Sequence, residues 1–294
     1  MNEVFHVSFP GLGINNLPVP RVFVNLFGID IYFYSLCICL GLLLSLILAA
    51  RRSHKFNIKD DDIYTIATLA IPLLIIGARL YFVAFEWNSF KGDLSKILDI
   101  RSGGLAFYGG VIGGIVAIYI VSKIRKVAFV DYLDYLCPYL ALGQAIGRWG
   151  NFFNQEAFGS NTTLPWGMIS EGTRSYLTQI EKNYHNMDIN PLLPVHPTFL
   201  YESLANLLIF ALIIRLQNKG YFGSRRRFFC SSVYLLCYGV TRFIVEGLRT
   251  DSLFVPNTSI RISQLLSIFM VVFAIIFLMY NLLFKRKEDD MTLE

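Results

Sequence analysis

The sequence predicts an all-α polytopic membrane protein with seven transmembrane helices. Hydrophobic residues make up 54% of the 294 residues and charged residues only 16%, whereas soluble domains carry about 25% charged residues. Long apolar runs recur along the whole chain, and each approaches the roughly 20 residues that a helix needs to cross about 30 Å of hydrocarbon. We therefore expect a single membrane-embedded domain that spans residues 1–294.

The apolar runs place the spans along the chain. We expect them at about residues 31–50, 63–85, 104–121, 132–149, 197–216, 228–248 and 262–284. Residues 1–29 are mixed in character and interrupted by prolines and glycines, so we expect them on the membrane surface. The polar segment 150–196 between the fourth and fifth spans is expected to form a head outside the bilayer.

Basic residues predict the orientation. The connections after the first, third, fifth and seventh spans contain 15 lysines and arginines, Arg225 among them. The other side contains nine, Arg101 among them, over much longer stretches. Because lysine and arginine accumulate on the cytoplasmic side, we expect the N-terminus and the head outside and the C-terminus inside. The charged site near the head would then face outward.

Charge and cysteine content exclude other classes. The net charge of +5 comes mostly from clusters at the ends of apolar runs, which indicates contact with anionic lipid rather than nucleic acid. The five cysteines lie in or beside apolar runs, and no zinc, nucleotide or serine-hydrolase motif is present. We expect no metal, no cofactor and no removable signal peptide. Without internal repeats, a secondary transporter is disfavoured.

The stretch 143–159, GQAIGRWGNFFNQEAFG, carries charge where a span ends. An arginine at mid-bilayer costs at least about 2.5 kcal/mol, so such a residue is usually functional. If the helix frays at Gly147 or Gly150, backbone N–H groups and side chains would converge on an anion, because arginine binds phosphate through a planar fork. The alternative is an arginine that only extends to the interface. The candidate residues are Arg148, Asn151, Asn154 and Glu156.

A second charged cluster lies near the outer end of the sixth span. Arg242, Glu246 and Arg249 are spaced i, i+4 and i+7 on one helix face, and Tyr238 precedes them by one turn on the same face. The row is either a self-neutralising structural ladder or an anion site with one net positive charge.

Three further features leave alternatives open. His196 opens the fifth span as a helix cap or as a member of a pocket. Arg79 lies within the second span and needs a polar partner, for which Glu86 at i+7 is a candidate. The paired glycines from Gly103 to Gly114 favour either close helix packing or a bent, partly non-helical start to the third span.

At these clusters the sequence resembles the prolipoprotein diacylglyceryl transferase family. GRWGNFFNQEAFG is similar to the family signature G-R-x-G-N-F-x-N-x-E, and HPTFLYE and YGVTRFIVEGLR also match family motifs. The resemblance implies transfer of a diacylglyceryl group from phosphatidylglycerol to the lipobox cysteine of a preprolipoprotein. The implied partners are phosphatidylglycerol, the signal peptide with its lipobox cysteine, and the bilayer.

The resemblance also implies site residues. Family-essential positions fall on Tyr34, Arg148, Asn151, Glu156, Gly159, Arg242 and Glu246, and important glycines on Gly103 and Gly109. The chain departs from the family at Tyr108, where many members have a histidine offered as general base, and at Phe199, where glutamine is common. Tyrosine titrates near pH 10, which argues against a histidine-type base at this position.

Our hypothesis is that Arg148 and Arg242 clamp the phosphate from two helices, with Tyr108 or His196 only positioning groups. Asn151 would orient the phosphate, while Glu156 and Glu246 hold the guanidinium groups. Two other readings compete: a channel or lipid-binding scaffold with a charged face, and a phospholipid transferase with the same phosphate site but another acceptor.

Overall fold

The computed structural model describes residues 4–99, 103–183, 189–223, 226–255, 258 and 260–291. Within these ranges the chain forms two compact units. The first comprises the described residues within Met1–Ser45, Cys137–Tyr221 and Phe229–Glu294, and the second those within Leu46–Leu136 and Phe222–Phe228. Arg101 and Arg225, which were counted for the orientation, lie outside the described residues.

Each predicted span coincides with a helix, with ends shifted by a few residues. The long helices are α1 (Phe33–Ser53), α2 (Asp60–Phe85), α4 (Phe107–Arg125), α5 (Phe129–Asn154), α7 (Thr198–Asn218), α8 (Phe229–Leu248) and α9 (Ile262–Met291). Six of those described, all except α5, are long and apolar enough to cross a membrane. The chain is therefore a multi-pass membrane protein.

Helix α5 differs from the other six in composition rather than in length. It has 26 residues and contains Pro138. Asp131, Asp134 and Arg148 lie within it, and such residues lower its mean hydropathy. It continues through Gly147 and Gly150 to Asn154, so the fraying considered from the sequence does not occur.

In the second unit, α2 and α4 pack against each other through glycines. A Cβ atom on Gly109 would overlap the carbonyl oxygen of Gly77, and one on Gly113 would overlap that of Leu73. Small residues allow helix backbones to approach this closely. Of the two readings of the glycine-rich segment, close packing therefore applies to Gly109 and Gly113, which are buried in a regular helix.

Arg79 of α2 holds the loop that precedes α4. Its five N–H groups donate to the carbonyl oxygens of Lys96, Ile97, Asp99, Gly103 and Gly104 at 2.5–3.0 Å. The predicted pairing with Glu86 is wrong, because the loop carbonyls occupy every donor of the guanidinium. Short elements, α3 (Trp87–Phe90) and η3 (Leu94–Leu98), lie in the segment that Arg79 secures.

In the first unit the N-terminal residues form strands rather than an irregular segment. β1 (Val4–Phe9) pairs with β2 (Ile14–Pro20), and β3 (Val22–Leu26) with β4 (Ile29–Tyr32), each antiparallel. The two hairpins are separate two-stranded sheets. The expectation of an all-α chain missed them, because the mixed segment 1–29 was assigned only to the membrane surface and not to any secondary structure.

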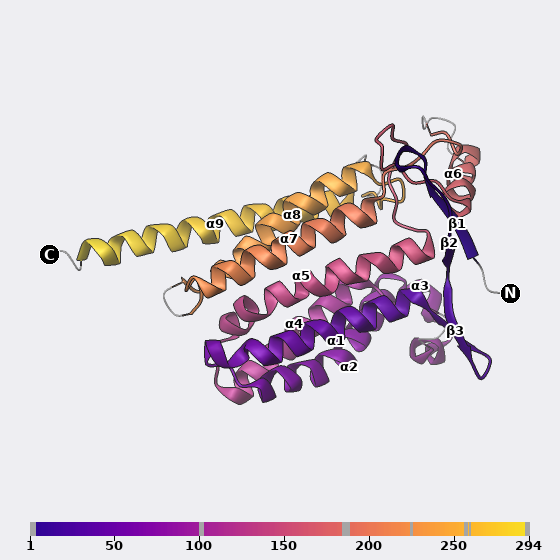
Figure 1. The fold of residues 1–294 in the computed structure, drawn as a ribbon. Coiled ribbons are helices and arrows are strands. Elements are labelled where there is room, and N and C mark those ends of the chain that lie inside the picture. Colours follow the sequence, from indigo (N-terminus) through magenta and orange to yellow (C-terminus); the bar gives the residue numbers. More distant parts are fainter. Residues whose placement is uncertain are drawn as a thin grey trace. The chain divides into compact units, whose positions relative to one another are not determined.

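Single bridges extend the β1–β2 hairpin into a head (Figure 1). Ser8 of β1 pairs with Ile169, Met168 pairs with Val195, and Val195 pairs with Asn161. Helix α6 (Glu171–Asn183) packs beside β1, where the Glu171 carboxylate accepts a hydrogen bond from the backbone N–H of His6 at 2.6 Å. The apolar core beneath contains Val7, Val19, Phe152, Phe158, Met168, Leu177, Val195 and Phe199.

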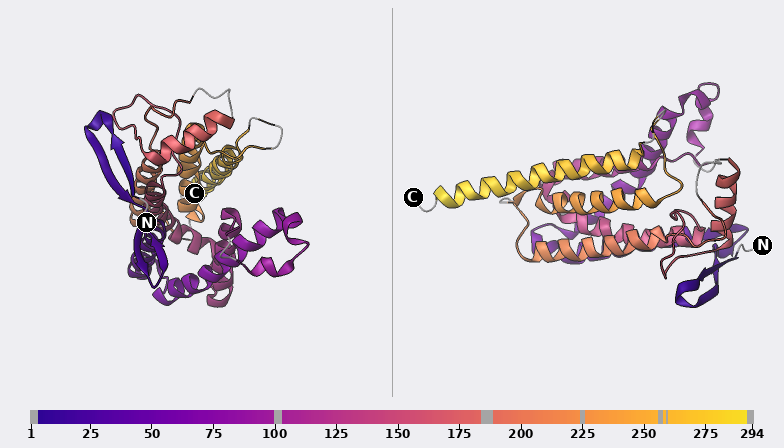
Figure 2. Two further views of the ribbon diagram at one scale, coloured as in Figure 1. Left: turned by 90° about the vertical axis from the view of Figure 1, so that its right-hand side faces the viewer. Right: turned by 90° about the horizontal axis from the view of Figure 1, so that it is seen from above.

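The long helices of the first unit carry this head at one end. Helices α7, α8 and α9 run side by side, and the head and the far end of α9 lie at opposite ends (Figures 1 and 2). Phe199, where the family commonly has glutamine, is 3% exposed and packs 5.0 Å from the ring of Phe152 and 5.6 Å from that of Trp149. The junction between head and helices is therefore packed with aromatic side chains.

Neighbouring glycines in α4 test the packing of the second unit. We expect Gly113→Ala to destabilise the protein by about 1–3 kcal/mol, because the new Cβ overlaps a backbone carbonyl that has no rotamer to adopt. Gly114→Ala is the control: its Cβ would lie 3.8 Å from Leu74 Cδ2, an ordinary contact, and alanine favours helix. Thermal denaturation in detergent compares the two; equal Tm values would contradict the packing role.

Candidate active site

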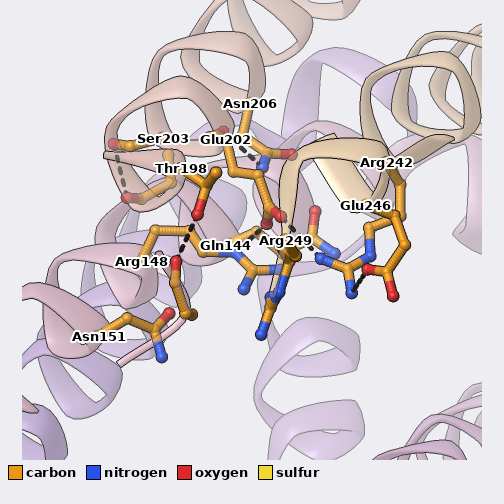
Figure 3. A network of polar contacts seen from close by, with 12 residues as sticks. Gln144, Arg148, Asn151, Thr198, Glu202, Ser203, Asn206, Arg242, Glu246 and Arg249 are labelled. Carbon is orange, nitrogen blue, oxygen red and sulfur yellow. Dashed lines mark hydrogen bonds and ion pairs between the residues drawn. The ribbon is translucent and has the colours of Figure 1, made fainter. Parts of the chain in front are cut away.

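Two arginines from different helices share one carboxylate in the first unit. Glu202 of α7 receives Arg148 of α5 on Oε2 and Arg242 of α8 on Oε1, the latter at 2.7 Å. Figure 3 shows Glu202 between the two guanidinium groups. A second carboxylate, that of Glu246, forms an ion pair with Arg242 at 2.6 Å. The two predicted clusters therefore meet, and the residue that joins them is Glu202.

The carboxylates are buried and the guanidinium groups remain reachable. Glu202 and Glu246 are 2% and 1% exposed, while the side chains of Arg148 and Arg242 are 22% and 16% exposed. Such charges are tolerated in a low-dielectric interior only when they are paired. The pairing fixes the orientation of both forks, and their exposed edges stay available to an anion.

These four side chains lie at the same end of their helices. Arg148 lies in the last turns of α5, Arg242 and Glu246 in the last turns of α8, and Glu202 in the second turn of α7. Since α7 begins at the head, all four lie at the head end of their helices. Ser203 donates to the carbonyl oxygen of Ala145 at 2.8 Å and joins α7 to α5. Tyr234 donates to Gln144 at 3.0 Å and joins α8 to α5.

Asn151 and Glu156 form a pair of their own at the end of α5. The Asn151 amide donates to Glu156 Oε1 at 2.8 Å. The expectation that Glu156 holds a guanidinium group is therefore wrong: it orients Asn151, and Glu202 takes the expected role at Arg148. Within the described part of the chain, the buried Oδ1 atom of Asn154 has no hydrogen-bond partner, so it can accept a bond from a ligand.

Tyr34 packs against the same end of α5. A Cβ atom on Gly150 would lie 2.8 Å from Tyr34 Cδ2, and the neighbouring Phe33 stacks on Phe153 at 4.5 Å. Tyr238 of α8 lies beside Arg148, close enough to interact with its guanidinium group. The first unit thus brings Tyr34 and Tyr238 beside the residues of both charged clusters.

In the second cluster Arg242 pairs with Glu246 as expected, whereas Arg249 pairs outside the row. Arg249 binds the Asp251 carboxylate in a bidentate manner at 2.8 and 2.6 Å. Burial lowers the pKa of Arg249, but the carboxylates of Asp251, Glu202 and Glu246 together outweigh burial and raise that pKa overall. With Arg148, Arg242 and Arg249 facing Glu202, Glu246 and Asp251, the set is neutral, so the predicted net positive charge does not arise from the helix row.

Arg261 supplies a further positive charge. Its guanidinium group donates to the carbonyl oxygen of Glu246 and lies 5.8 Å from the ring centre of Phe254. Neither partner is a carboxylate. Arg261 precedes α9 and is therefore at the head end, like the other charges. From the sequence, Arg261 contributed only to the nine basic residues on the side expected to face outward.

Gly159 and His196 join the head to the charged clusters. The Gly159 N–H donates to the His196 carbonyl at 2.9 Å, and the Ser160 N–H to the Leu248 carbonyl at 2.7 Å. A Cβ atom on Gly159 would lie 2.8 Å from that of His196 and 3.0 Å from the Leu248 oxygen. Glycine is therefore required where the head strand crosses the ends of α7 and α8.

The remaining predicted residues belong to the second unit. Gly103 has φ +92° and gives its carbonyl oxygen to Arg79, and Gly109 packs against α2. The Tyr108 ring lies 6.4 Å from that of Tyr81. Roles for Tyr108, Gly103 and Gly109 at the substrate remain predictions.

Sequence reasoning missed Glu202, Asp251 and Arg261 as site residues. Glu202 was visible as the acid of HPTFLYE, six residues after His196, and its buried position within an apolar run was the available signal. Asp251 and Arg261 lie in a short connection, so their partners depend on how that connection folds. Among the described residues, no group of three or more His, Cys, Asp or Glu residues has the arrangement of a metal site.

Comparison with known proteins yields one consistent result. The family model described as prolipoprotein diacylglyceryl transferase matches residues 21–280. A relative from Finegoldia magna is 42% identical and covers 87% of this chain and 93% of its own length. Relatives from Clostridioides difficile and Enterococcus faecalis are each 38% identical, covering 93% and 92% of this chain and 99% and 96% of their own. All three are named phosphatidylglycerol–prolipoprotein diacylglyceryl transferase.

The shared carboxylate predicts a strong effect of its neutralisation. We expect Glu202→Gln to destabilise the protein by about 3 kcal/mol or more, because two partly buried guanidinium groups lose their counter-charge. Glu181→Gln, on the exposed face of α6, is the matched control and should leave Tm unchanged. Thermal denaturation of the detergent-solubilised protein measures both; a Glu202→Gln variant as stable as the control would show that the carboxylate does not hold the arginines.

Proposed function

Because the chain belongs to the prolipoprotein diacylglyceryl transferase family, we propose that it transfers the diacylglyceryl group of phosphatidylglycerol to the lipobox cysteine of preprolipoproteins. The product is a thioether, and glycerol phosphate leaves. The observation that carries this proposal is the placement of Arg148 and Arg242 on the two oxygens of Glu202. A single phosphodiester meets two fixed guanidinium forks there.

Some guanidinium nitrogens of Arg148 and Arg242 pair with carboxylates, and the others are left for the phosphate. Arg148 presents Nε to Glu202, and Arg242 presents Nη1 to Glu202 and Nη2 to Glu246. Other N–H groups on each arginine therefore remain to bind phosphate oxygens, and guanidinium groups bind them in bidentate fashion. Because Glu202 and Glu246 hold the forks before the lipid arrives, little side-chain reorganisation is required at the moment of reaction.

The reaction exchanges one carbon–oxygen bond for a carbon–sulfur bond. The cysteine sulfur attacks C3 of the diacylglyceryl moiety and forms the C–S bond. The bond from C3 to the phosphate oxygen breaks, and its electron pair leaves with glycerol phosphate. The leaving group gains one negative charge in this step, so the fixed positive charges of Arg148 and Arg242 stabilise the transition state more than the bound lipid.

Activation of the thiol follows from the same charges. A free cysteine titrates near pH 8.5, and neighbouring guanidinium groups favour its thiolate. The thiol proton is released to solvent or to glycerol phosphate. No dedicated base is required in this scheme, which agrees with tyrosine rather than histidine at position 108.

The other candidate residues would surround the substrates. Asn151, oriented by Glu156, would donate to the phosphate, and Asn154 offers a buried acceptor to the glycerol hydroxyl groups. Tyr34 and Tyr238 would flank the lipid at the helix ends. Gly159 allows the head segment to lie close to the arginines. The backbone of Arg249 pairs with that of Gly159 and so fixes this segment at the end of α8. Tyr108, Gly103 and Gly109 belong to the second unit, and their proposed role is to position substrate groups.

We propose a seven-span topology in the bacterial inner membrane, with α5 as the span whose polar residues face protein. The head and the arginines would then face outward, and the C-terminus the cytoplasm. The distribution of lysine and arginine supports this orientation. A span as polar as α5 is tolerated where its polar groups line a protein interior, and the pairing of Arg148 with Glu202 is such an arrangement.

The two competing functions are less well supported. An anion pore would have charges spread through the membrane depth, whereas the paired charges Arg148, Glu202, Arg242 and Glu246 gather at the head end of α5, α7 and α8. A transferase with another acceptor would use the same phosphate clamp. Mass spectrometry separates the three: a lipobox peptide that gains a diacylglyceryl mass supports the proposal, and lipid turnover without such a gain supports the other transferase.

Arg242→Lys tests the clamp. Lysine keeps the charge and loses the fork, so we expect kcat for phosphatidylglycerol and a lipobox peptide to fall by about 10²–10³-fold, the usual effect of removing one transition-state donor. Arg174→Lys, on the exposed face of α6, is the control. Unchanged turnover in Arg242→Lys would refute the clamp.

Cysteine labelling tests the orientation. In a variant without the five native cysteines, Leu12→Cys in the head should react with a membrane-impermeant maleimide in intact cells. Lys59→Cys, in the exposed connection between α1 and α2, should react only after the cells are opened. The reverse pattern would place the head in the cytoplasm.

A further inference from the structure

The head contains an open cavity that the clamp does not use. It has a volume of about 530 Å³ and is lined among others by Gly11, Thr163, Leu164, Pro165, Leu193 and His196. A volume of this size holds a ligand of several hundred daltons. None of its lining residues carries a lysine, arginine, aspartate or glutamate side chain, so the cavity suits a neutral ligand rather than a phosphate.

His196 places an imidazole ring in the wall of this cavity. Trp166 Nε1 donates to the hydroxyl oxygen of Tyr201 at 2.8 Å, and that hydroxyl lies 3.1 Å from His196 Nδ1. Because the Tyr201 oxygen accepts from the indole, its own proton is available to Nδ1 of His196, and a neutral imidazole that accepts this proton bond carries its hydrogen on Nε2. In the binding site inferred below, His196 has this tautomer. Burial lowers the pKa of His196 and maintains this neutral form.

Thr163 places a backbone N–H and a side-chain hydroxyl in the wall of the cavity. It is exposed, and neither its N–H nor its hydroxyl has a hydrogen-bond partner in the described part of the chain. Leu164 and Leu193, which are 41% and 49% exposed, form apolar flanks. A protein that binds an extended peptide commonly offers hydrogen-bonding groups to the peptide backbone and apolar surfaces to its side chains. The wall of this cavity offers both.

The cavity is close to the arginines along the chain. His196 precedes α7 by two residues and Glu202 lies four residues after Thr198, about 6 Å along the helix axis. The Gly159 N–H binds the His196 carbonyl at 2.9 Å, and Gly159 also pairs with Arg249. An extended chain advances about 3.3 Å per residue, so a few residues span this separation.

We infer that this cavity binds the extended polypeptide segment that follows the lipobox cysteine of the substrate. The inference rests on the proposed function. With the cysteine at Arg148 and Arg242 and the signal helix in the bilayer, the chain beyond the cysteine leaves on the head side. The segment two to four residues past the cysteine reaches the cavity, where the His196 Nε2–H and the Thr163 N–H donate to its carbonyl oxygens.

The test uses the full-length protein in detergent and a fluorescent peptide in which serine replaces the lipobox cysteine. Binding is measured by anisotropy, so it does not depend on turnover. We expect Thr163→Trp, which fills the cavity, to raise the peptide Kd at least tenfold. Ser175→Trp, on the exposed face of α6 in the same head, is the matched control and should leave Kd unchanged.

A shortened peptide completes a double-mutant cycle. Removing the residues after the serine should weaken binding to the unmodified protein about tenfold and have little further effect on Thr163→Trp, because both changes remove one interaction. His196→Phe should weaken binding of the long peptide, while His196→Gln, which keeps a donor, should restore part of it. Independent, additive effects of truncation and Thr163→Trp would overturn the inference, as would an unchanged Kd in Thr163→Trp.

Transfer by the unmodified protein to a cysteine peptide is measured in parallel. If diacylglyceryl transfer occurs but Kd is insensitive to Thr163→Trp, the cavity inference fails and the proposed function stands. If binding depends on Thr163 but no diacylglyceryl mass is gained, the proposed function fails and the peptide site stands.

Discussion

The buried carboxylate of Glu202 is the interaction on which the site depends. Three helices would each place a charge in an apolar setting, where an isolated ion is costly. By accepting Arg148 on one oxygen and Arg242 on the other, Glu202 makes these charges compatible with the interior. The same contact sets the spacing of the two forks, so stability and phosphate recognition arise from one arrangement.

The protein uses two different solutions for an arginine within its helices. At Arg148 and Arg242 the counter-charges are carboxylates, and exposed N–H groups remain for a ligand. At Arg79 five backbone carbonyl oxygens occupy all the donors, and the side chain is 6% exposed. At Arg148 and Arg242 some N–H groups stay free to bind a ligand, whereas at Arg79 every N–H group is used to hold a loop. The number of unused donors therefore separates a site arginine from a structural one.

The head covers one side of the site and so restricts the directions from which substrates can reach the arginines. Strand bridges connect β1 to residues 168–169, 194–196 and 159–162 in turn, and the last of these crosses the ends of α7 and α8 at Gly159. A lipid must approach the arginines from the membrane, whereas a peptide in the proposed reaction reaches them past His196. The neutral cavity beside His196 and the charged cluster beyond Gly159 thus offer chemically distinct surfaces to two chemically distinct substrates.

The sequence by itself determined the membrane class, the positions of the long helices and the residue types of both charged clusters, because hydrophobic length and the cost of buried charge are local properties. It did not determine which charges pair. Glu202, Glu156 and Asp251 are all acids near arginines in the chain, yet the first bridges two helices, the second orients Asn151 and the third binds Arg249. Glu156 and Asp251 pair within their own short segments, so their partners depend on the local course of the chain after α5 and α8. The two partners of Glu202, like the strand bridges of the head and the carbonyl cage of Arg79, depend on distances between segments remote in sequence. Only tertiary packing sets such distances.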